Sequence, residues 1–105
     1  MNFGSLLGFH ARTRGDAIAV RDNNSALTYS QLDDLAGKVA AILHKRGVEK
    51  GMPVAVISGN CLNQAVLYAG IMYAGALFAP INFRLNSEEI ANLLNLIGNP
   101  LTVAD

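Results

Sequence analysis

The stretch from Ile57 to Leu85 limits the possible folds more than any other part of the chain. Its central residues, 62–74, are almost all apolar, and a helix with apolar residues on most faces must be buried between other elements. Gly75 is predicted to end this helix in a left-handed conformation. The short apolar segments on either side, Pro53–Ser58 and Leu77–Ile81, are typical of buried parallel strands.

A second helix, upstream of this stretch, has clear start and stop signals. Thr28 and Gln31 form a capping box, in which each side chain satisfies the backbone amide of the other residue. The apolar residues that follow recur on one face, as in an amphipathic helix. Gly47 supplies a left-handed stop. The pattern predicts a helix over Tyr29–Arg46.

The C-terminal part repeats these signals. Asn86 and Glu89 form another capping box, followed by apolar residues at helical spacing up to Ile97. Residues 98–100, Gly-Asn-Pro, end this helix. The apolar segment Leu101–Ala104 is then predicted to be a strand.

The N-terminal part predicts a helix and a hairpin. Apolar residues at helical spacing between Phe3 and Ala11 indicate a helix that Asn2 can cap. The segments Ala17–Arg21 and Ala26–Thr28 are predicted to pair through a turn. The whole order indicates an α/β fold, in which an N-terminal hairpin precedes alternating helices and strands of a mostly parallel sheet with right-handed crossovers.

The composition indicates that this fold needs additional cover. Hydrophobic residues make up 51% of the 105 residues, and charged residues only 15%, against roughly 25% charged residues in an average soluble domain. The cover could come from the rest of a longer chain, from a second copy, or from a membrane. The membrane is the weakest of these, because Gly70, Gly75 and Pro80 interrupt the longest apolar run, so no transmembrane segment is predicted.

Charge and cysteine content favour a cytoplasmic protein that does not bind nucleic acid. Eight basic residues balance eight acidic ones, so no strong field attracts a polyanion. The N-terminal segment Met1–Gly8 lacks the pattern of a secretory signal. The single cysteine, Cys61, cannot form an internal disulfide, which fits a reducing compartment.

No complete catalytic or metal-binding constellation is visible in the sequence. His10 lies on a predicted helix with no nucleophile or metal ligand nearby in sequence, so we interpret it as a residue of a helix face. Cys61 lies near a helix N-terminus, which could lower its thiol pKa. With no paired His or second Cys apparent, a structural role is favoured.

Arg84 is the one candidate for ligand binding. It comes just after a predicted strand, and open α/β sheets bind ligands at the carboxyl ends of their strands. A guanidinium there could contact a phosphate of a nucleotide or of coenzyme A. The alternative is a structural arginine bonded to nearby carbonyls or to Glu88.

Several motifs, in order, resemble one enzyme family. Leu27–Asp33 resembles "T-Y-x-E-L", Leu43–Gly51 resembles a helix end followed by "R-G-V-x-x-G", and Asn86–Leu94 resembles "P-E-E-L-x-x-I-L". Residues 73–76 and 80–85 resemble "K-A-G-A" and "P-x-N-x-R-L". Together they resemble the adenylate-forming enzymes, which comprise acyl-CoA synthetases, luciferases and peptide-synthetase adenylation domains.

The sequence departs from the family pattern at four places. Met52-Pro53 stands where Asp-Arg is usual, Gly15 replaces a common Pro, residues 61–64 replace an "S-x-E-F" segment, and Tyr73 stands where Lys is frequent. These departures concern surfaces and caps.

The resemblance implies that residues 1–105 are an N-terminal subdomain fragment of an AMP-binding, adenylate-forming domain. Such enzymes use Mg-ATP to convert a carboxylate to an acyl-adenylate and then transfer the acyl group to coenzyme A. The phosphate loop, the magnesium-binding residues and the catalytic lysine of the family have no counterpart here. The fragment is therefore expected to be scaffold and catalytically inactive alone, with the remainder of the parent enzyme, or a second copy, covering its exposed apolar surface.

Two other interpretations stay open. The chain could be a free-standing small α/β module for binding or assembly. It could also be a fragment of a peptide-synthetase adenylation domain, although the form of residues 82–85, Asn-Phe-Arg-Leu, leans towards acyl-CoA synthetases.

Overall fold

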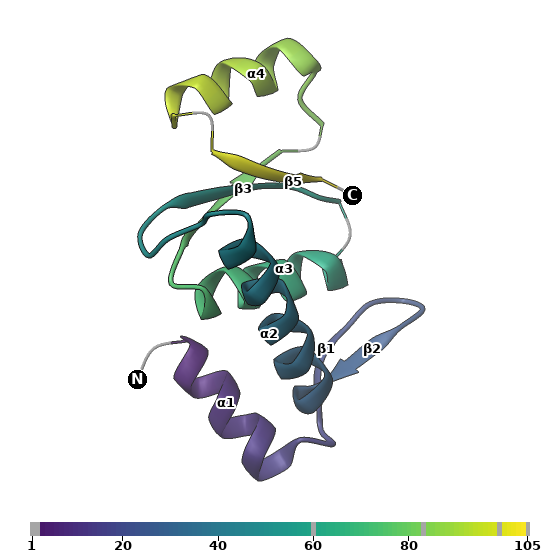
Figure 1. Ribbon diagram of the computed structural model, residues 1–105. Coiled ribbons are helices and arrows are strands. Elements are labelled where there is room, and N and C mark those ends of the chain that lie inside the picture. Colours follow the sequence, from purple (N-terminus) through teal and green to yellow (C-terminus); the bar gives the residue numbers. More distant parts are fainter. Residues whose placement is uncertain (1–2, 60, 83, 99, 105) are drawn as a thin grey trace.

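The chain folds around a short parallel sheet with helices on both faces (Figure 1). The computed structural model describes residues 3–59, 61–82, 84–98 and 100–104. Nine elements follow one another in these ranges: α1 (Phe3–Arg14), β1 (Ile18–Arg21), β2 (Ala26–Thr28), α2 (Tyr29–Lys45), β3 (Pro53–Ile57), α3 (Cys61–Tyr73), β4 (Leu77–Ile81), α4 (Ser87–Leu96) and β5 (Leu101–Ala104).

The parallel sheet has the strand order β4-β3-β5. Val54 of the central strand β3 is in register with Phe78 of β4 and Leu101 of β5, and both pairings are parallel, as the sequence predicted. The helix that joins β3 to β4, α3, covers one face, whereas α4, which joins β4 to β5, lies on the other (Figure 1). The chain thus reverses direction across the sheet, as in doubly wound α/β folds.

The main core lies between β3 and the two helices α2 and α3. Val54, Val56 and Ile71 are fully buried there, and Leu43 is 3% exposed. At the crossing of α2 and α3, a Cβ atom built on Gly70 would lie 2.4 Å from the Cβ of Val39. Glycine is therefore required for the close approach of these helices.

The helix signals of the sequence are confirmed, with small changes in bounds. The Gln31 amide donates to Thr28 Oγ1 over 3.2 Å, and the Thr28 amide donates to Gln31 Oε1 over 2.8 Å. Arg46 is the C-cap and not the last residue of α2. Gly47 and Gly75 have φ angles of +87° and +76°, so both are left-handed stops.

The prediction that the apolar helix is buried between other elements was only half correct. In α3, residues 69–71 are buried, but residues 62 and 64–68 are partly exposed and Asn63 is exposed. The helix also begins at Cys61 and ends at Tyr73, each one residue earlier than predicted. Ala69 packs against α1 and α2, and Ile71 packs in the main core, whereas residues 62–68 are only partly covered by the described elements.

The prediction that β4 is a buried strand was wrong. β4 is an edge strand, with Leu77 57% exposed and Pro80 also exposed. The helix that follows it has the predicted capping box, because Glu89 N donates to Asn86 Oδ1 over 2.8 Å. None of the residues of α4 is buried.

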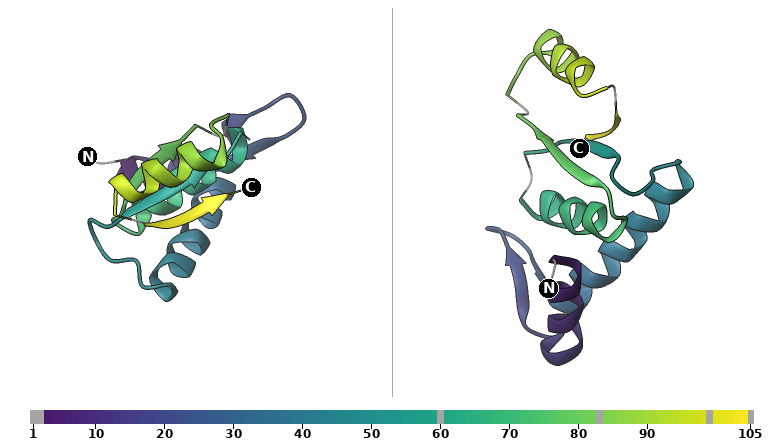
Figure 2. Two further views of the ribbon diagram at one scale, coloured as in Figure 1. Left: turned by 90° about the horizontal axis from the view of Figure 1, so that it is seen from above. Right: turned by 90° about the vertical axis from the view of Figure 1, so that its left-hand side faces the viewer.

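The N-terminal elements form a separate layer beside α2 and α3 (Figure 2). Leu7 of α1 packs with Leu32 and Ala36 of α2 and with Ala69 of α3. The predicted hairpin is present as an antiparallel pair, β1 with β2, whose first strand starts at Ile18 and not at Ala17. The proposed cap, Asn2, lies outside the described residues.

Candidate functional site

The candidate site is the edge of the sheet where the parallel strands end, here called the carboxyl edge. It comprises Ser58 and Gly59 after β3, Asn82 and Arg84 after β4, and Ala104 at the end of β5. Because the three strands are parallel, these segments leave the sheet on the same side. The chain reverses its winding direction in this sheet, and such reversals are where α/β proteins open a crevice for ligands.

Ser58 and Gln64 fix the turn between β3 and α3. Ser58 is only 2% exposed, and its backbone carbonyl accepts a hydrogen bond from Gln64 Nε2 over 2.7 Å. The strand predicted over Pro53–Ser58 ends one residue earlier, at Ile57, so Ser58 belongs to the turn. A side chain of α3 thereby holds the backbone that leads from the central strand into the helix.

Asn82 shapes the turn that carries Arg84. Its side-chain Oδ1 accepts from the Arg84 amide over 2.9 Å, and its backbone carbonyl accepts from the Leu85 amide over 3.2 Å. Arg84 is exposed. The sequence placed Arg84 just past a strand end, and the structure does so too. Both the ligand-binding and the structural interpretation of its side chain stay predictions.

A small cavity next to the carboxyl edge was missed by sequence reasoning. It has a volume of about 160 Å³ and is lined by residues of α3 and β5: Asn63, Val66, Leu67, Val103 and Ala104. Its walls are mainly aliphatic, so it suits apolar groups better than phosphates. No local sequence signal joins residues 40 positions apart, which explains why the pattern did not reveal it.

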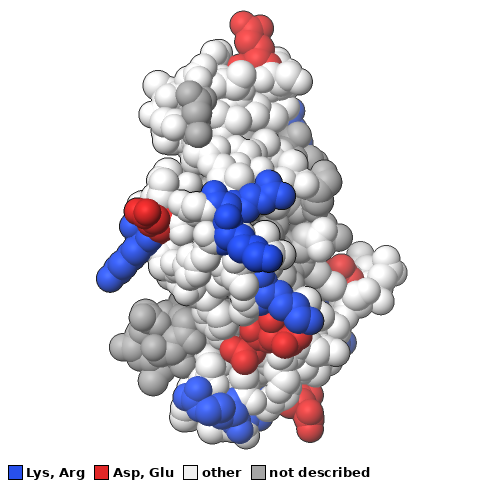
Figure 3. All heavy atoms as spheres, viewed as in Figure 1, with Lys and Arg blue, Asp and Glu red and all other residues white. Residues whose placement is uncertain are grey.

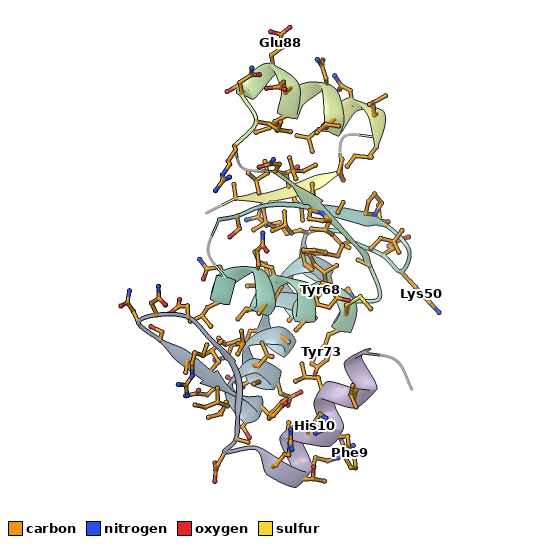
Figure 4. The ribbon with its side chains drawn as sticks, turned by 180° about the vertical axis from the view of Figure 1, so that it is seen from behind. Phe9, His10, Lys50, Tyr68, Tyr73 and Glu88 are labelled. Carbon is orange, nitrogen blue, oxygen red and sulfur yellow. The ribbon has the colours of Figure 1, made fainter. Side chains whose placement is uncertain are left out.

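A hydrogen bond between Tyr73 and Asp33 was also missed. The Tyr73 hydroxyl donates to Asp33 Oδ1 over 2.5 Å and links α3 to α2. Burial, and then this hydrogen bond and the negative charge of Asp33, raise the pKa of Tyr73 well above its usual range. Figure 4 shows Tyr73 between α3 and α1. This pair holds helices together, and it lies on the far side of α3 from the sheet.

His10 makes ring contacts on α1, as a residue of a helix face would. Its ring centroid lies 5.0 Å from that of Tyr29 and 5.6 Å from that of Phe9 (Figure 4). Its Nδ1 is buried and has no hydrogen-bond partner among the described residues. Cys61 opens α3, but its side chain is not among those described, so its predicted structural role stays a prediction.

The described residues offer no metal-binding cluster and no membrane-spanning helix. Within the described ranges, no three His, Cys, Asp or Glu side chains come together as ligands for a metal ion. None of the helices there combines the length and the apolar character that crossing a membrane requires. On the face drawn in Figure 3, several basic side chains gather in the centre, with acidic side chains below them. Lys38 forms an ion pair of 3.2 Å with Asp34.

Comparisons with known proteins agree on one family. The family model described as "AMP-binding enzyme" matches residues 9–104. A substituted indenyl-propanoyl:CoA ligase from Rhodococcus jostii is 40% identical over 90 residues, which are 86% of this chain and 18% of that protein. Tyrocidine synthase 2 from Brevibacillus parabrevis is 32% identical over 98 residues, which are 93% of this chain and 3% of that protein.

A solved structure shows the same arrangement of elements. The N-terminal domain of FACL13 from Mycobacterium tuberculosis superposes with a TM-score of 0.90 at 28% identity, covering 99% of this chain and 27% of that one. This chain therefore spans about a quarter of that domain and less than a fifth of the two relatives above.

Proposed function

The chain belongs to the AMP-binding enzyme family, and from this we propose that it is the N-terminal part of an acid–thiol ligase, an AMP-forming acyl-CoA synthetase. The observation that carries the proposal is the match of the family model to nearly the whole chain, residues 9–104. One CoA ligase is 40% identical to this chain, above the 32–35% of the peptide synthetases, and this supports the thiol acceptor coenzyme A. The proposed place of the reaction is the cytoplasm, and the proposed pathway is fatty acid metabolism.

The proposed reaction has two steps. A carboxylate oxygen of the acid attacks the α-phosphorus of Mg-ATP, and pyrophosphate leaves. The thiolate of coenzyme A then attacks the acyl carbonyl carbon, and AMP leaves. Such chemistry needs charge stabilisation at the transferring phosphorus and magnesium ligands. The described residues include no cluster that would hold magnesium, so in this proposal those groups belong to the larger protein.

The role proposed for this chain is to form part of the wall of the site. The turns after β3 and β4 are fixed by Gln64 and Asn82, so the backbone at the carboxyl edge is preorganised. Arg84 follows Asn82 on an exposed turn. We propose that its guanidinium contacts a phosphate of the nucleotide or of coenzyme A.

The experiment is an assay of the full-length protein with a panel of carboxylic acids. Acid-dependent exchange of pyrophosphate into ATP tests the first step, and coenzyme A-dependent release of AMP tests the second. Exchange without coenzyme A-dependent AMP release would favour the second candidate, a peptide-synthetase adenylation domain. That candidate is supported by the match to tyrocidine synthase 2.

The 105-residue chain serves as the negative control for the same assay. No exchange is expected from it, because no described cluster can hold Mg-ATP in a defined pose. Exchange by the short chain would contradict the scaffold role. If the full-length protein exchanges pyrophosphate with none of the acids, the ligase proposal is contradicted. A binding or assembly module is then the remaining alternative.

The role of Arg84 is tested in the same full-length protein. Arg84→Ala should raise KM for ATP or for coenzyme A about tenfold, the usual loss on removal of one charge-assisted hydrogen bond. Arg12→Ala is the matched control, because Arg12 is an exposed arginine in the last turn of α1, and α1 lies at the opposite end of the molecule from the sheet (Figure 1). If the KM values of Arg84→Ala equal those of the control variant and of the unsubstituted protein, Arg84 is structural.

A further inference from the structure

The loop that joins β1 to β2 contains two consecutive asparagines, Asn23 and Asn24, followed by Ser25. It projects from the side of the molecule, and residues 23–25 are exposed (Figure 1). An asparagine followed by a small residue in such a loop is the usual setting for deamidation, in which the next backbone nitrogen attacks the side-chain amide. Asparagine is one of the thermally labile residues of proteins. The loop therefore has the composition of a modification site.

Asp22 holds both backbone nitrogens that this reaction uses. Its side-chain Oδ1 accepts from the Asn24 amide over 2.8 Å and from the Ser25 amide over 2.7 Å. The nitrogen of Asn24 is the nucleophile for a reaction at Asn23. The nitrogen of Ser25 is the nucleophile for a reaction at Asn24. A single carboxylate oxygen therefore restrains both possible attacks.

The two hydrogen bonds slow the attack for two physical reasons. The backbone nitrogen must lose its proton to attack, and a hydrogen bond to a carboxylate oxygen stabilises the protonated nitrogen. The nitrogen must also turn toward the side-chain Cγ of the preceding residue, whereas the bond to Asp22 fixes its peptide plane. The Asp22 amide further closes the loop by donating to the Ser25 carbonyl over 2.9 Å. All these bonds lie within four residues, so they do not depend on what covers the rest of the chain.

We propose that Asn24 is a latent deamidation site and that Asp22 keeps its reaction slow. Asn24 is favoured over Asn23 because the residue after it, Ser25, is the smaller one. The Ser25 nitrogen forms a bond to Asn24 Cγ, and the side-chain nitrogen leaves as ammonia with the proton of the attacking nitrogen. Water then opens the cyclic imide: its hydroxyl joins one carbonyl carbon and its hydrogen returns to the nitrogen. The product is aspartate or isoaspartate, whatever reaction the larger protein catalyses.

Isoaspartate would change the shape of the hairpin as well as its charge. It inserts one extra carbon into the main chain of a loop that closes on the pair of Arg21 with Ala26. The register of a hairpin is set by the type and length of its turn. The strands behind that pair carry Ala19 and Leu27, which pack against the core between α1, α2 and α3. Conversion of Asn24 to isoaspartate should therefore loosen the hairpin from this core.

The first test follows deamidation of the full-length protein in mildly alkaline buffer by peptide mass spectrometry, with fragment ions that separate residues 22, 23 and 24. Asp22→Ala removes the acceptor oxygen and should raise the rate at residue 24 about tenfold, because both hydrogen bonds to the carboxylate are lost. Asp22→Asn is the matched control, since its side-chain oxygen can accept from the same two amides. This variant should stay within about threefold of the unsubstituted protein, because only the charge is lost.

Three outcomes would overturn the proposal. One is an equal rate in Asp22→Ala and in the unsubstituted protein. Another is a slower reaction in Asp22→Ala, which would make the carboxylate a base for the attack and not a restraint. The third is an Asp22→Asn variant that reacts as fast as Asp22→Ala, which would mean that the hydrogen bonds do not restrain the loop. Amide exchange at residues 26–28 should stay unchanged in both variants, because neither substitution lies in a strand.

A second measurement needs no variant. Amide hydrogen exchange at Ser25 requires the same hydrogen bond to open as the attack on Asn24 does. The rates of exchange and of deamidation in the full-length protein are compared with those in an unstructured peptide of residues 20–27. Both rates should be lower in the protein by similar factors, about tenfold or more. If the Ser25 amide is protected while Asn24 reacts as fast as in the peptide, the proposal is contradicted.

Discussion

The helices α2 and α4 begin with the same local chemistry and end in different environments. Each has a complete capping box and one apolar stripe. The longer helix, α2, packs against α1, α3 and the hairpin, and buries Leu32, Ala36, Ala40 and Leu43. No residue of α4 is buried, and it has no comparable partner among the described elements. Capping therefore defines where a helix begins, whereas its stability comes from what it packs against.

The largest effect should come from the crossing that anchors α2. Gly70→Ala should destabilise the chain by about 3 kcal/mol or more, because the new Cβ would lie 2.4 Å from Val39 and overpack two rigid helices. Gly37→Ala is the matched control on α2, where a Cβ meets nothing within 4 Å. It should stabilise by about 0.5–1 kcal/mol through helix propensity. Urea denaturation measures the free energy of unfolding of both variants. Similar midpoints would show that the crossing at Gly70 does not anchor α2.

The next effect compares one leucine from each helix. Leu43→Ala on α2 should cost about 2–3 kcal/mol, at the lower end for a buried leucine because Leu43 lines a groove between α2 and β5. Leu93→Ala on α4 should cost less than about 1 kcal/mol, because Leu93 is already 37% exposed. Thermal unfolding of both variants gives the difference. A larger loss for Leu93→Ala would mean that α4 is the better packed helix.

A smaller effect tests how α2 is tied to α3. Tyr73→Phe removes the hydroxyl that donates to Asp33 and should cost about 1–2 kcal/mol, reduced by the partial exposure of the pair. Because the pKa of Tyr73 is raised in the folded chain, the unfolded chain loses this proton first as pH rises. The wild-type stability should fall as pH rises above 10.0, the usual pKa of the phenol. Tyr73→Phe should lose that part of the slope, and two parallel pH profiles would contradict the assignment.

The smallest effect separates the two capping boxes. Thr28→Ala and Asn86→Ala each remove one cap and should cost about 1 kcal/mol of helix stability. In α2 the core holds the helix in place, so the loss appears only in global unfolding. In α4 the first turn should open locally. Amide exchange of residues 87–91 should therefore rise in Asn86→Ala at unchanged midpoint, and slow exchange there would show that α4 is held by packing.

The sequence predicted the features that depend on residues a few positions apart along the chain. Caps such as Thr28 and stops such as Gly75 follow from backbone hydrogen bonding within a few residues, and their places are confirmed. The left-handed conformation predicted for Gly75 is confirmed by its φ of +76°. A Cβ there would meet Lys50 Cγ at 3.4 Å, which is ordinary contact, whereas the close helix approach that the sequence did not reveal is at Gly70.

The rest depends on pairings between distant residues. Pro80 is a local sign of an edge strand, but the apolar run around it led to the prediction that β4 is buried, as β3 is. The bond between Tyr73 and Asp33 joins residues 40 positions apart. For the candidate site, the sequence placed Arg84 after a strand end but could not reveal the cavity between α3 and β5.

The strand order also bears on how the chain reaches its fold. Val54 must meet both Phe78 and Leu101, and the second closure spans a loop about twice as long, at an extra entropic cost of about 0.6 kcal/mol. A newly made chain can therefore complete the β3–α3–β4 unit before β5 docks. Substitutions in β5 should then speed unfolding more than they slow folding.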